Sequence, residues 1–314
     1  MPSSAHKLMV IAMKHILITG GTGLIGSALC ELLVSQHHHV TVLSRHPETV
    51  KDKCGKQVKG IESLSDIDDE TTIDWVFNLA GEPIADKPWT KKRKAVLEAS
   101  RIDLTRQLVD WIMERTNAPD CLISGSAVGW YGDGKDAVLT EQSGFADEYT
   151  HQLCDAWEQQ ALRASQVDVR VCTVRTGLVL ASTGGFLHKM LLPFKLGLGG
   201  KLGSGQQYMP WVHINDMVHL LVFLADSAKA QGPFNASSPN PVSNKLFTKT
   251  LAEVLHRYAF IPVPAWLLKG VLGEMSGLLL TGQRAIPEKS QAMGFCFFYS
   301  DLKITLTDVL RTKH

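Results

Sequence analysis

The stretch ILITGGTGLIGSAL, residues 16–29, joins an apolar run to a cluster of glycines and then to an amphipathic pattern. Gly21, Gly23 and Gly26 satisfy the spacing G-x-G-x-x-G, and Gly20 with the last two also satisfies G-x-x-G-x-x-G. The apolar run predicts a buried strand over residues 15–19, and the pattern after the glycines predicts a helix. Glycines at such a junction permit a tight turn and let main-chain N–H groups at the helix N-terminus approach a pyrophosphate. A glycine turn with a purely structural role is the alternative, and the flanking strand and helix disfavour it.

The rest of the first half alternates short aliphatic runs with amphipathic stretches, which is typical of parallel strands separated by helices. Further strands are predicted over residues 40–43, 73–79, 121–124 and 169–176. A long helix is predicted between the third and fourth strands, because Val96, Ile102, Leu108, Val109 and Ile112 share one helical face. We therefore predict an α/β protein with a Rossmann-type doubly wound parallel sheet.

Beyond residue 183 the pattern changes to glycine-rich loops, prolines and shorter helices. Ser243 and Ser300 are predicted to cap helices in this part, and Asn215 or Asp216 to cap another. We divide the chain into an N-terminal extension over 1–12, a nucleotide-binding domain over 13–182 that later elements complete, and a mainly substrate-side region over 183–314. That last region is predicted to be a smaller α+β unit.

The charge balance excludes a global preference for polyanions. Thirty-two Lys and Arg residues stand against 31 Asp and Glu residues, a formal net charge of +1. No partner among nucleic acids or membranes is expected. The six cysteines lack CxxC or CxxH spacing and are read as reduced thiols of a cytoplasmic protein, with no metal site.

The end of the second predicted strand indicates which dinucleotide is bound. Where an NAD-binding protein would carry Asp or Glu for the ribose hydroxyl, this chain carries Ser44 and Arg45. A guanidinium can bind a 2′-phosphate through charge-assisted hydrogen bonds, so the sequence favours NADP(H). The alternative is that Arg45 is merely a solvated loop residue. After the next strand, Leu79, Ala80 and Gly81 would lie beside the cofactor, although this NLAG string could equally be an ordinary strand end.

Several strings together resemble the extended branch of the short-chain dehydrogenase/reductase superfamily, the NAD(P)-dependent epimerases and dehydratases. They are TGGTGLIG, NLAG, SGSAVGWYG and WVHINDM. The strings LLPFKLGLGGKLGSGQQYMPWVHINDM, GPFNASSPNPVSN and GEMSGLLLTGQRAIPEK narrow the resemblance to the atypical "epimerase family protein" subgroup. The resemblance runs from Met13 to nearly the end of the chain. It implies a Rossmann fold and a nicotinamide cofactor, suggests a homodimer, and leaves the substrate unknown.

The resemblance also carries roles onto particular residues. Ser126 is similar to the superfamily's catalytic serine, with Ser124 as a neighbouring candidate, and a structural serine at a strand end is the alternative. Tyr131 is a phenol near the expected site that could donate a proton, or an aromatic ring that packs against the loop. Arg101 matches a helix position that faces the nucleotide, although a surface arginine is the alternative. The complete cofactor set is Gly20, Gly21, Thr22, Gly23, Leu24, Ile25, Gly26, Ser44, Arg45, Leu79, Ala80, Gly81 and Arg101.

One departure from the superfamily pattern concerns its Tyr-x-x-x-Lys pair. When Glu158 is matched to the glutamate that follows that lysine by four, the tyrosine and lysine positions hold Thr150 and Cys154. Neither side chain can exchange a proton near neutrality as that pair does. Tyr149 lies one residue off and has no lysine four residues later.

Two functions of different classes remain. The first is an NADP(H)-dependent oxidoreductase, or a nucleotide-sugar-type epimerase or dehydratase, acting on an unknown small molecule. The second is an NADP(H)-binding sensor or interaction protein without turnover, which the missing pair supports. Lys189, Lys195 and Lys201 could line a site for an anionic substrate, but solvated lysines are the favoured interpretation.

Overall fold

Alternating side chains divide strand β1 (His15–Thr19) between two faces of a central sheet. In the computed structural model, which describes residues 13–311, Ile16 and Ile18 join one apolar cluster and Leu17 joins another. Successive side chains of a strand point to opposite faces, so a run that is apolar throughout must be covered on both sides. β1 is therefore a central strand with helices above and below it.

The main sheet has seven strands in the order β11-β7-β5-β4-β1-β2-β3, and all neighbouring pairs are parallel. Its other strands are β2 (His39–Leu43), β3 (Lys59–Ile61), β4 (Trp75–Asn78), β5 (Cys121–Ala127), β7 (Arg170–Thr176) and β11 (Gly232–Ala236). The strand order reverses between β1 and β4, and ligands of such sheets bind outside the carboxyl ends at that point. The prediction of a Rossmann-type doubly wound sheet is confirmed.

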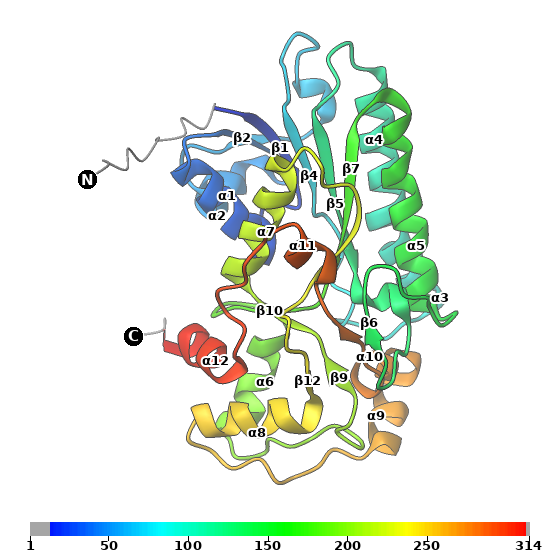
Figure 1. The fold of residues 1–314 in the computed structure, drawn as a ribbon, viewed down its shortest axis with the longest axis vertical. Coiled ribbons are helices and arrows are strands. Elements are labelled where there is room, and N and C mark those ends of the chain that lie inside the picture. Colours follow the sequence, from blue (N-terminus) through cyan, green and yellow to red (C-terminus); the bar gives the residue numbers. More distant parts are fainter. Residues whose placement is uncertain (1–12, 312–314) are drawn as a thin grey trace, which may run out of the picture.

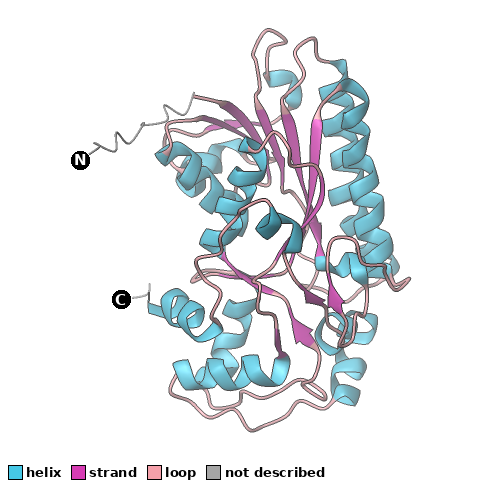
Figure 2. Cartoon of the chain, in the orientation of Figure 1, coloured by secondary structure: helices cyan, strands magenta, loops and turns pink. Residues whose placement is uncertain are grey.

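Helices cover both faces of this sheet (Figure 1). One face carries α1 (Leu24–Ser35), α2 (Val50–Cys54) and α7 (Ile214–Asp226), and the other carries α4 (Leu104–Glu114) and α5 (Tyr149–Leu162). Figure 2 shows the resulting helix, sheet and helix layers. β11 and α7 come from beyond residue 183 and join these layers.

The long helix predicted before β5 is interrupted. α3 (Lys91–Glu98) passes into a π-helical turn over Ala99–Asp103, and α4 follows. π-helical turns inside helices are rare and frequently occur at functional sites. The apolar spacing predicted the buried face of α4, where Leu108, Val109 and Ile112 are buried, but not the irregular turn. The prediction that Val96 shares this face is wrong, because Val96 is exposed and Leu97 is the buried residue of α3.

The remaining chain forms a second region below the sheet (Figure 1). It contains α6 (Gly185–Lys195), α8 (Asn244–Val254), α9 (Ala265–Leu272), α10 (Gly277–Leu280) and α12 (Leu302–Arg311) around the pairs β8–β10 and β9–β12. These strands are β8 (Leu178–Leu180), β9 (Tyr208–Met209), β10 (Trp211–His213) and β12 (Val242–Ser243). β13 (Arg284–Ala285) pairs with β6 (Val138–Leu139) and leads to α11 (Glu288–Ala292). A separate apolar cluster from α6, α8 and α12 forms its core.

Helix caps beyond residue 183 test three sequence predictions. Ser243 Oγ accepts a hydrogen bond from the Leu246 amide, which confirms it as the cap of α8. At α12 the prediction of Ser300 is wrong, because Asp301 Oδ1 accepts from the Ile304 amide. At α7 the prediction of Asn215 or Asp216 is also wrong, because His213 Nδ1 accepts from the Asn215 amide.

The proposed boundary at 182/183 and the extension over 1–12 stay predictions, and residues 1–12 lie outside the described part of the chain. Between residues 13 and 311, no helix is long and apolar enough to cross a membrane. All six cysteines are free thiols, and only Cys296 is exposed.

Candidate functional site

The glycine turn between β1 and α1 depends on close backbone contacts. Gly20 has a φ of +70°, and a Cβ at this residue would lie 2.7 Å from the main chain of Leu79 and Ala80. A Cβ on Gly26 would lie 2.2 Å from the Gly20 carbonyl oxygen, so α1 can approach the turn this closely only with glycine there. Gly21 also leaves no room for a side chain, because a Cβ there would lie 2.6 Å from the Val42 side chain.

Gly23 has a different role, because it is exposed and stands at the N-cap of α1. No side chain caps this helix, so the first-turn amides of Leu24, Ile25 and Gly26 are left for an outside acceptor. Amides at a helix N-terminus, together with the helix dipole, form an anion site. The turn therefore fits a pyrophosphate at the edge where β1 ends.

The end of β4 lies directly against this turn. The Leu79 amide donates to the Thr19 carbonyl at 3.1 Å, and the Ala80 amide donates to Thr19 Oγ1 at 3.2 Å. These bonds hold Leu79 and Ala80 beside Gly20. The predicted NLAG segment is thus adjacent to the predicted phosphate turn.

The end of β2 presents Ser44 and Arg45. Ser44 Oγ accepts from the His46 amide at 3.1 Å and so shapes the loop. The Arg45 side chain is 86% exposed, and its guanidinium pairs with the Glu82 carboxylate at 3.4 Å. Exposed ion pairs contribute only about 0–1 kcal/mol, so this guanidinium can be recruited by a phosphate.

Arg101 comes from the π-helical turn and lies against the loop that follows β4. Its guanidinium donates to the Glu82 carbonyl at 2.8 Å and to the Leu97 carbonyl at 3.2 Å. A Cβ on Gly81 would lie 3.1 Å from Arg101 Cζ. Burial lowers the pKa of this guanidinium. Gly81 and Arg101 are thus neighbours, and the sequence prediction that Arg101 looks toward the nucleotide cleft stays a prediction.

Ser126 belongs to a buried charged network at the carboxyl ends of β5 and β7. Its Oγ donates to Glu158 Oε1 at 2.6 Å, and Glu158 receives two bonds from Arg175 at 2.9 and 3.0 Å. Ser126 and Arg175 are partners in the β5–β7 register. The Arg175 guanidinium also lies 3.4 Å from the centre of the Trp130 ring.

The Tyr131 hydroxyl also makes a buried hydrogen bond within the protein. Its hydroxyl donates to Asn235 Oδ1 at 2.8 Å, and burial raises the pKa of the phenol. Neither Ser126 nor Tyr131 lines the large cavity between the sheet and the second region. Their assignment to the reaction stays a prediction, and the contacts favour a positioning role for both.

A cavity of about 870 Å³ opens between the carboxyl ends of β5 and β7 and the second region. Ala127 and Thr176 supply the sheet side, and α6 and α10 supply the opposite side. The cavity and the glycine turn meet at Gly185, where a Cβ would lie 3.0 Å from Leu24 Cδ2. A ligand that extends along the sheet edge from the turn would therefore reach this cavity.

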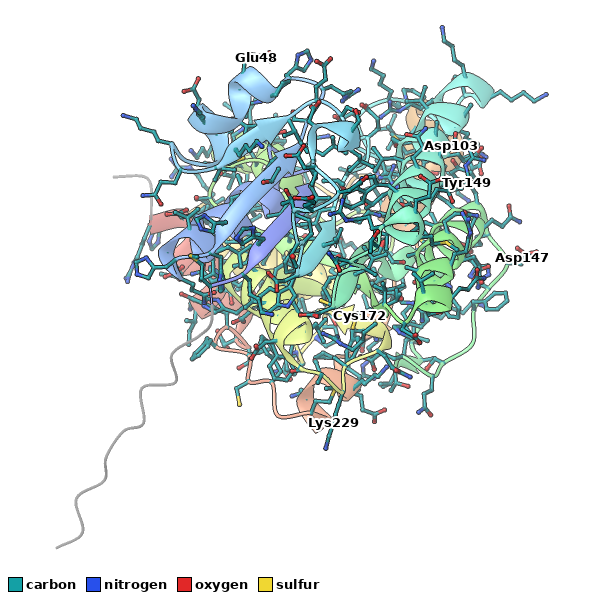
Figure 3. All side chains as sticks on the ribbon, turned by 90° about the horizontal axis from the view of Figure 1, so that it is seen from above. Glu48, Asp103, Asp147, Tyr149, Cys172 and Lys229 are labelled. Carbon is teal, nitrogen blue, oxygen red and sulfur yellow. The ribbon has the colours of Figure 1, made fainter. Side chains whose placement is uncertain are left out.

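The cavity is also lined by the residues that the sequence resemblance matches to the superfamily's tyrosine and lysine. Thr150 and Cys154 both line it, as does Tyr149. Burial raises the pKa of Cys154 to about 12, and burial with nearby carboxylates raises the pKa of Tyr149 to about 12. Both groups are therefore protonated near neutral pH. Figure 3 labels Tyr149 on the side of the molecule that carries α3 to α5.

Sequence reasoning missed a cation beside Tyr149. Lys94 of α3 places its ammonium 4.0 Å from the centre of the Tyr149 ring and also pairs with Glu274 at 2.7 Å. Lys94 belongs to a helix more than 50 residues earlier in the chain than Tyr149, so the spacing within the helix of Tyr149 does not indicate it. The spacing of residues within one helix does not indicate a contact with a distant segment. Glu158, Arg175 and the cavity walls were missed for the same reason.

No group of three or more His, Cys, Asp or Glu side chains within residues 13–311 is arranged to hold a metal ion. The features of the site are thus a parallel sheet, an uncapped glycine turn and an adjoining cavity. Together they define a nucleotide-binding α/β protein.

This chain belongs to the NAD dependent epimerase/dehydratase family, which matches residues 16–237. A domain of unknown function, DUF1731, matches residues 263–309. An epimerase family protein of Staphylococcus aureus is 38% identical over 300 residues, which cover 95% of this chain and all of that protein. The epimerase family protein YfhF of Bacillus subtilis is 37% identical over 94% of this chain and 98% of its own length.

Among solved structures, the human epimerase family protein SDR39U1 with NADPH has a TM-score of 0.85 and 32% identity. The match covers 95% of this chain and 99% of that one. A UDP-galactose 4-epimerase has a TM-score of 0.72 at 17% identity over 96% of this chain and all of its own, a likeness of fold alone. The resemblance inferred from the sequence is confirmed, and a nicotinamide cofactor is supported for the family.

Proposed function

We propose that this chain is an NADP(H)-dependent oxidoreductase that acts on a small molecule held in the cavity beside the sheet. Arg45 carries the cofactor part of the proposal, because an exposed, weakly paired guanidinium stands at the end of β2 where NAD-binding proteins place a carboxylate. The NADPH in the human relative's structure supports the same cofactor. When bound, this cofactor supplies or accepts a hydride.

The residues of the chain have separable tasks in this proposal. The first-turn amides of α1 bind the pyrophosphate, and Arg45 with Ser44 binds the 2′-phosphate. Walls from α6 and α10 exclude water from the reacting atoms. Ser126 acts through Glu158 and Tyr131 through Asn235, so both position the strand ends rather than touch the substrate.

Proton transfer needs a route without the Tyr-x-x-x-Lys pair. Thr150 lines the cavity at the tyrosine position and can donate a hydrogen bond to a substrate oxygen. Its hydroxyl does not ionise near neutrality. We therefore assign the proton to water and the orientation of the oxygen to Thr150.

Binding titrations test the cofactor assignment. Native protein is expected to bind NADPH at least about tenfold more tightly than NADH, since a charged hydrogen bond contributes about 1.5–3 kcal/mol. Arg45→Asp should remove this preference. Arg106→Asp, an exposed arginine paired with Asp103, is the matched control and should retain it. Equal affinities for the two nucleotides in native protein would end the assignment of Arg45.

Hydride transfer tests the activity itself. NADPH deuterated at either face of C4 is incubated with a panel of carbonyl compounds, and the products are analysed by mass spectrometry. Transfer from one face only is the expected result. Tight NADPH binding without label transfer to any compound would favour the nucleotide-binding sensor instead.

A further inference from the structure

The cavity has predominantly apolar walls, and this bears on what the enzyme proposed above can accept. The side chains that face it include Ile84, Trp89, Phe186, Leu202, Met209 and Leu279. Aromatic rings line several sides, and those of Trp89 and Tyr149 meet edge to face at 5.1 Å. Pockets of about 300–1,000 Å³ with such walls suit organic ligands of drug size, whose affinity comes from buried apolar surface.

The charges around the cavity are unfavourable for a phosphorylated substrate. Among the described lining residues, Lys189 is the only lysine or arginine, and its ammonium pairs with Asp86. The lining also contains Glu148 and Glu274. Lys189 neutralises Asp86, and Lys94 neutralises Glu274 from outside the lining, so Glu148 leaves the surroundings of the cavity with a net negative charge. This charge disfavours a diphosphate, which proteins usually bind with arginine, lysine or free helix amides.

Cations next to the lining are also committed to other partners. Lys94 pairs with Glu274, and Lys201 donates to the Ser204 carbonyl at 3.3 Å. The Arg284 guanidinium lies 5.1 Å from the centre of the Tyr208 ring. These contacts weaken the alternative that the lysines of this region form an anionic-substrate site.

We infer that the cavity takes an apolar, uncharged carbonyl compound, or the corresponding alcohol, and not a nucleotide sugar. This inference rests on the proposed function for its reaction but not for its binding. In the reductive direction the substrate's carbonyl carbon gains the hydride of NADPH, the C=O π bond opens, and the oxygen takes a proton from water, which leaves as hydroxide and is neutralised by the solvent. NADP⁺ and an alcohol result, and the reverse reaction oxidises the alcohol.

Displacement of a neutral dye tests ligand class independently of turnover. Nile red, which is uncharged and apolar, is titrated into NADPH-saturated native protein. Neutral aromatic and alicyclic ketones are expected to displace it at micromolar to submillimolar concentrations, and UDP-glucose and UDP-galactose are expected not to displace it. The same compounds are then assayed for NADPH oxidation.

A variant with a charge in the cavity wall tests whether the ligand is apolar. Leu278→Lys places an ammonium on the cavity side of α10, and it should weaken dye and ketone binding at least about tenfold, because a charge is costly beside apolar surface. Leu246→Lys, on the exposed face of α8 and outside the lining, is the control and should bind both as native protein does. NADPH binding by both variants shows that they are folded.

The outcomes separate the two proposals. Displacement by ketones without NADPH oxidation would sustain the ligand class and overturn the oxidoreductase. Displacement or turnover with UDP-sugars alone would overturn the ligand class and leave the oxidoreductase in place. Displacement by neither class, or equal dye binding by Leu278→Lys and native protein, would also overturn the ligand class.

Discussion

Gly26 shows how a single hydrogen in place of a side chain permits the nucleotide turn. Gly26→Ala should destabilise the fold by about 1–3 kcal/mol and abolish measurable NADPH binding, because its Cβ would overlap the Gly20 carbonyl at 2.2 Å. Urea denaturation and nucleotide titration measure the two effects. Gly144→Ala is the control, since nothing lies within 4 Å of its Cβ position. A Gly26→Ala variant that binds NADPH normally would refute the packing argument.

Glu158 and Arg175 form an ion pair whose side chains are only 7% and 3% exposed. Glu158→Gln should lower the free energy of unfolding by about 3–5 kcal/mol, because it leaves the arginine charged and buried without its counter-ion. Asp103→Asn breaks an exposed pair with Arg106 and should cost no more than about 1 kcal/mol. Chemical denaturation of both variants gives the comparison, and equal losses would contradict the role assigned to burial.

At the level of elements, α7 begins with a buried histidine. His213 is 2% exposed, accepts the Asn215 amide at Nδ1 and stacks on Tyr299 with ring centres 3.7 Å apart. Burial lowers the pKa of His213 below its usual 6.5, and the nearby carboxylates of Asp308 and Asp216 only partly oppose this shift. A protonated Nδ1 would also lose its ability to accept the amide hydrogen.

Acidification should therefore weaken the fold through His213. Because the folded-state pKa is the lower one, the contribution is complete above pH 6.5 and is lost as pH falls through the window below it. His38 is also buried with a lowered pKa and adds to the same loss. His213→Asn keeps a capping side chain without a titrating ring, so its unfolding free energy should fall less between pH 7 and 5.5.

Denaturation midpoints across this pH range measure the slope for native protein and His213→Asn. His219→Asn alters an exposed histidine of the same helix and is the matched control. If the unfolding free energy of His213→Asn falls with pH as steeply as that of native protein, other groups cause the acid sensitivity.

The interrupted helix between β4 and β5 shows which features of a helix the spacing of apolar residues can predict. Spacing identified the buried face of α4, because apolar side chains every three or four residues must face the sheet. It did not report the π-helical turn over Ala99–Asp103, which directs Arg101 at the Glu82 carbonyl. The contact of Arg101 with that carbonyl joins the turn to the loop after β4, which spacing within one helix does not indicate.

For the whole molecule, cofactor binding should stabilise the native state by mass action. At NADPH concentrations about 100-fold above the dissociation constant, the free energy of unfolding should rise by about 2.7 kcal/mol, which raises Tm by several degrees. Thermal unfolding followed by tryptophan fluorescence measures the shift, and Gly26→Ala should show none. An unchanged Tm of native protein at saturating NADPH would contradict binding to the folded state.

Local sequence was sufficient for five of the seven strands of the main sheet and for the glycine turn, whereas β3 and β11 were not predicted. Apolar runs predict buried strands, and the glycine spacing predicts a turn in which Gly20 takes a positive φ and Gly26 admits a close helix. These properties depend on neighbours within a few residues, so they can be read without knowledge of the fold. The cofactor-selecting role proposed for Arg45 was inferred from the same local pattern.

Contacts between distant segments could not be predicted from the sequence and are visible only in the tertiary structure. Strand register brings Ser126 beside Arg175, and α3 brings Lys94 to Tyr149 although 55 positions separate them. The cavity and its charges arise where the sheet edge meets a region from the other half of the chain. Side-chain spacing encodes which face of an element is buried, but the partner on that face depends on how the elements pack.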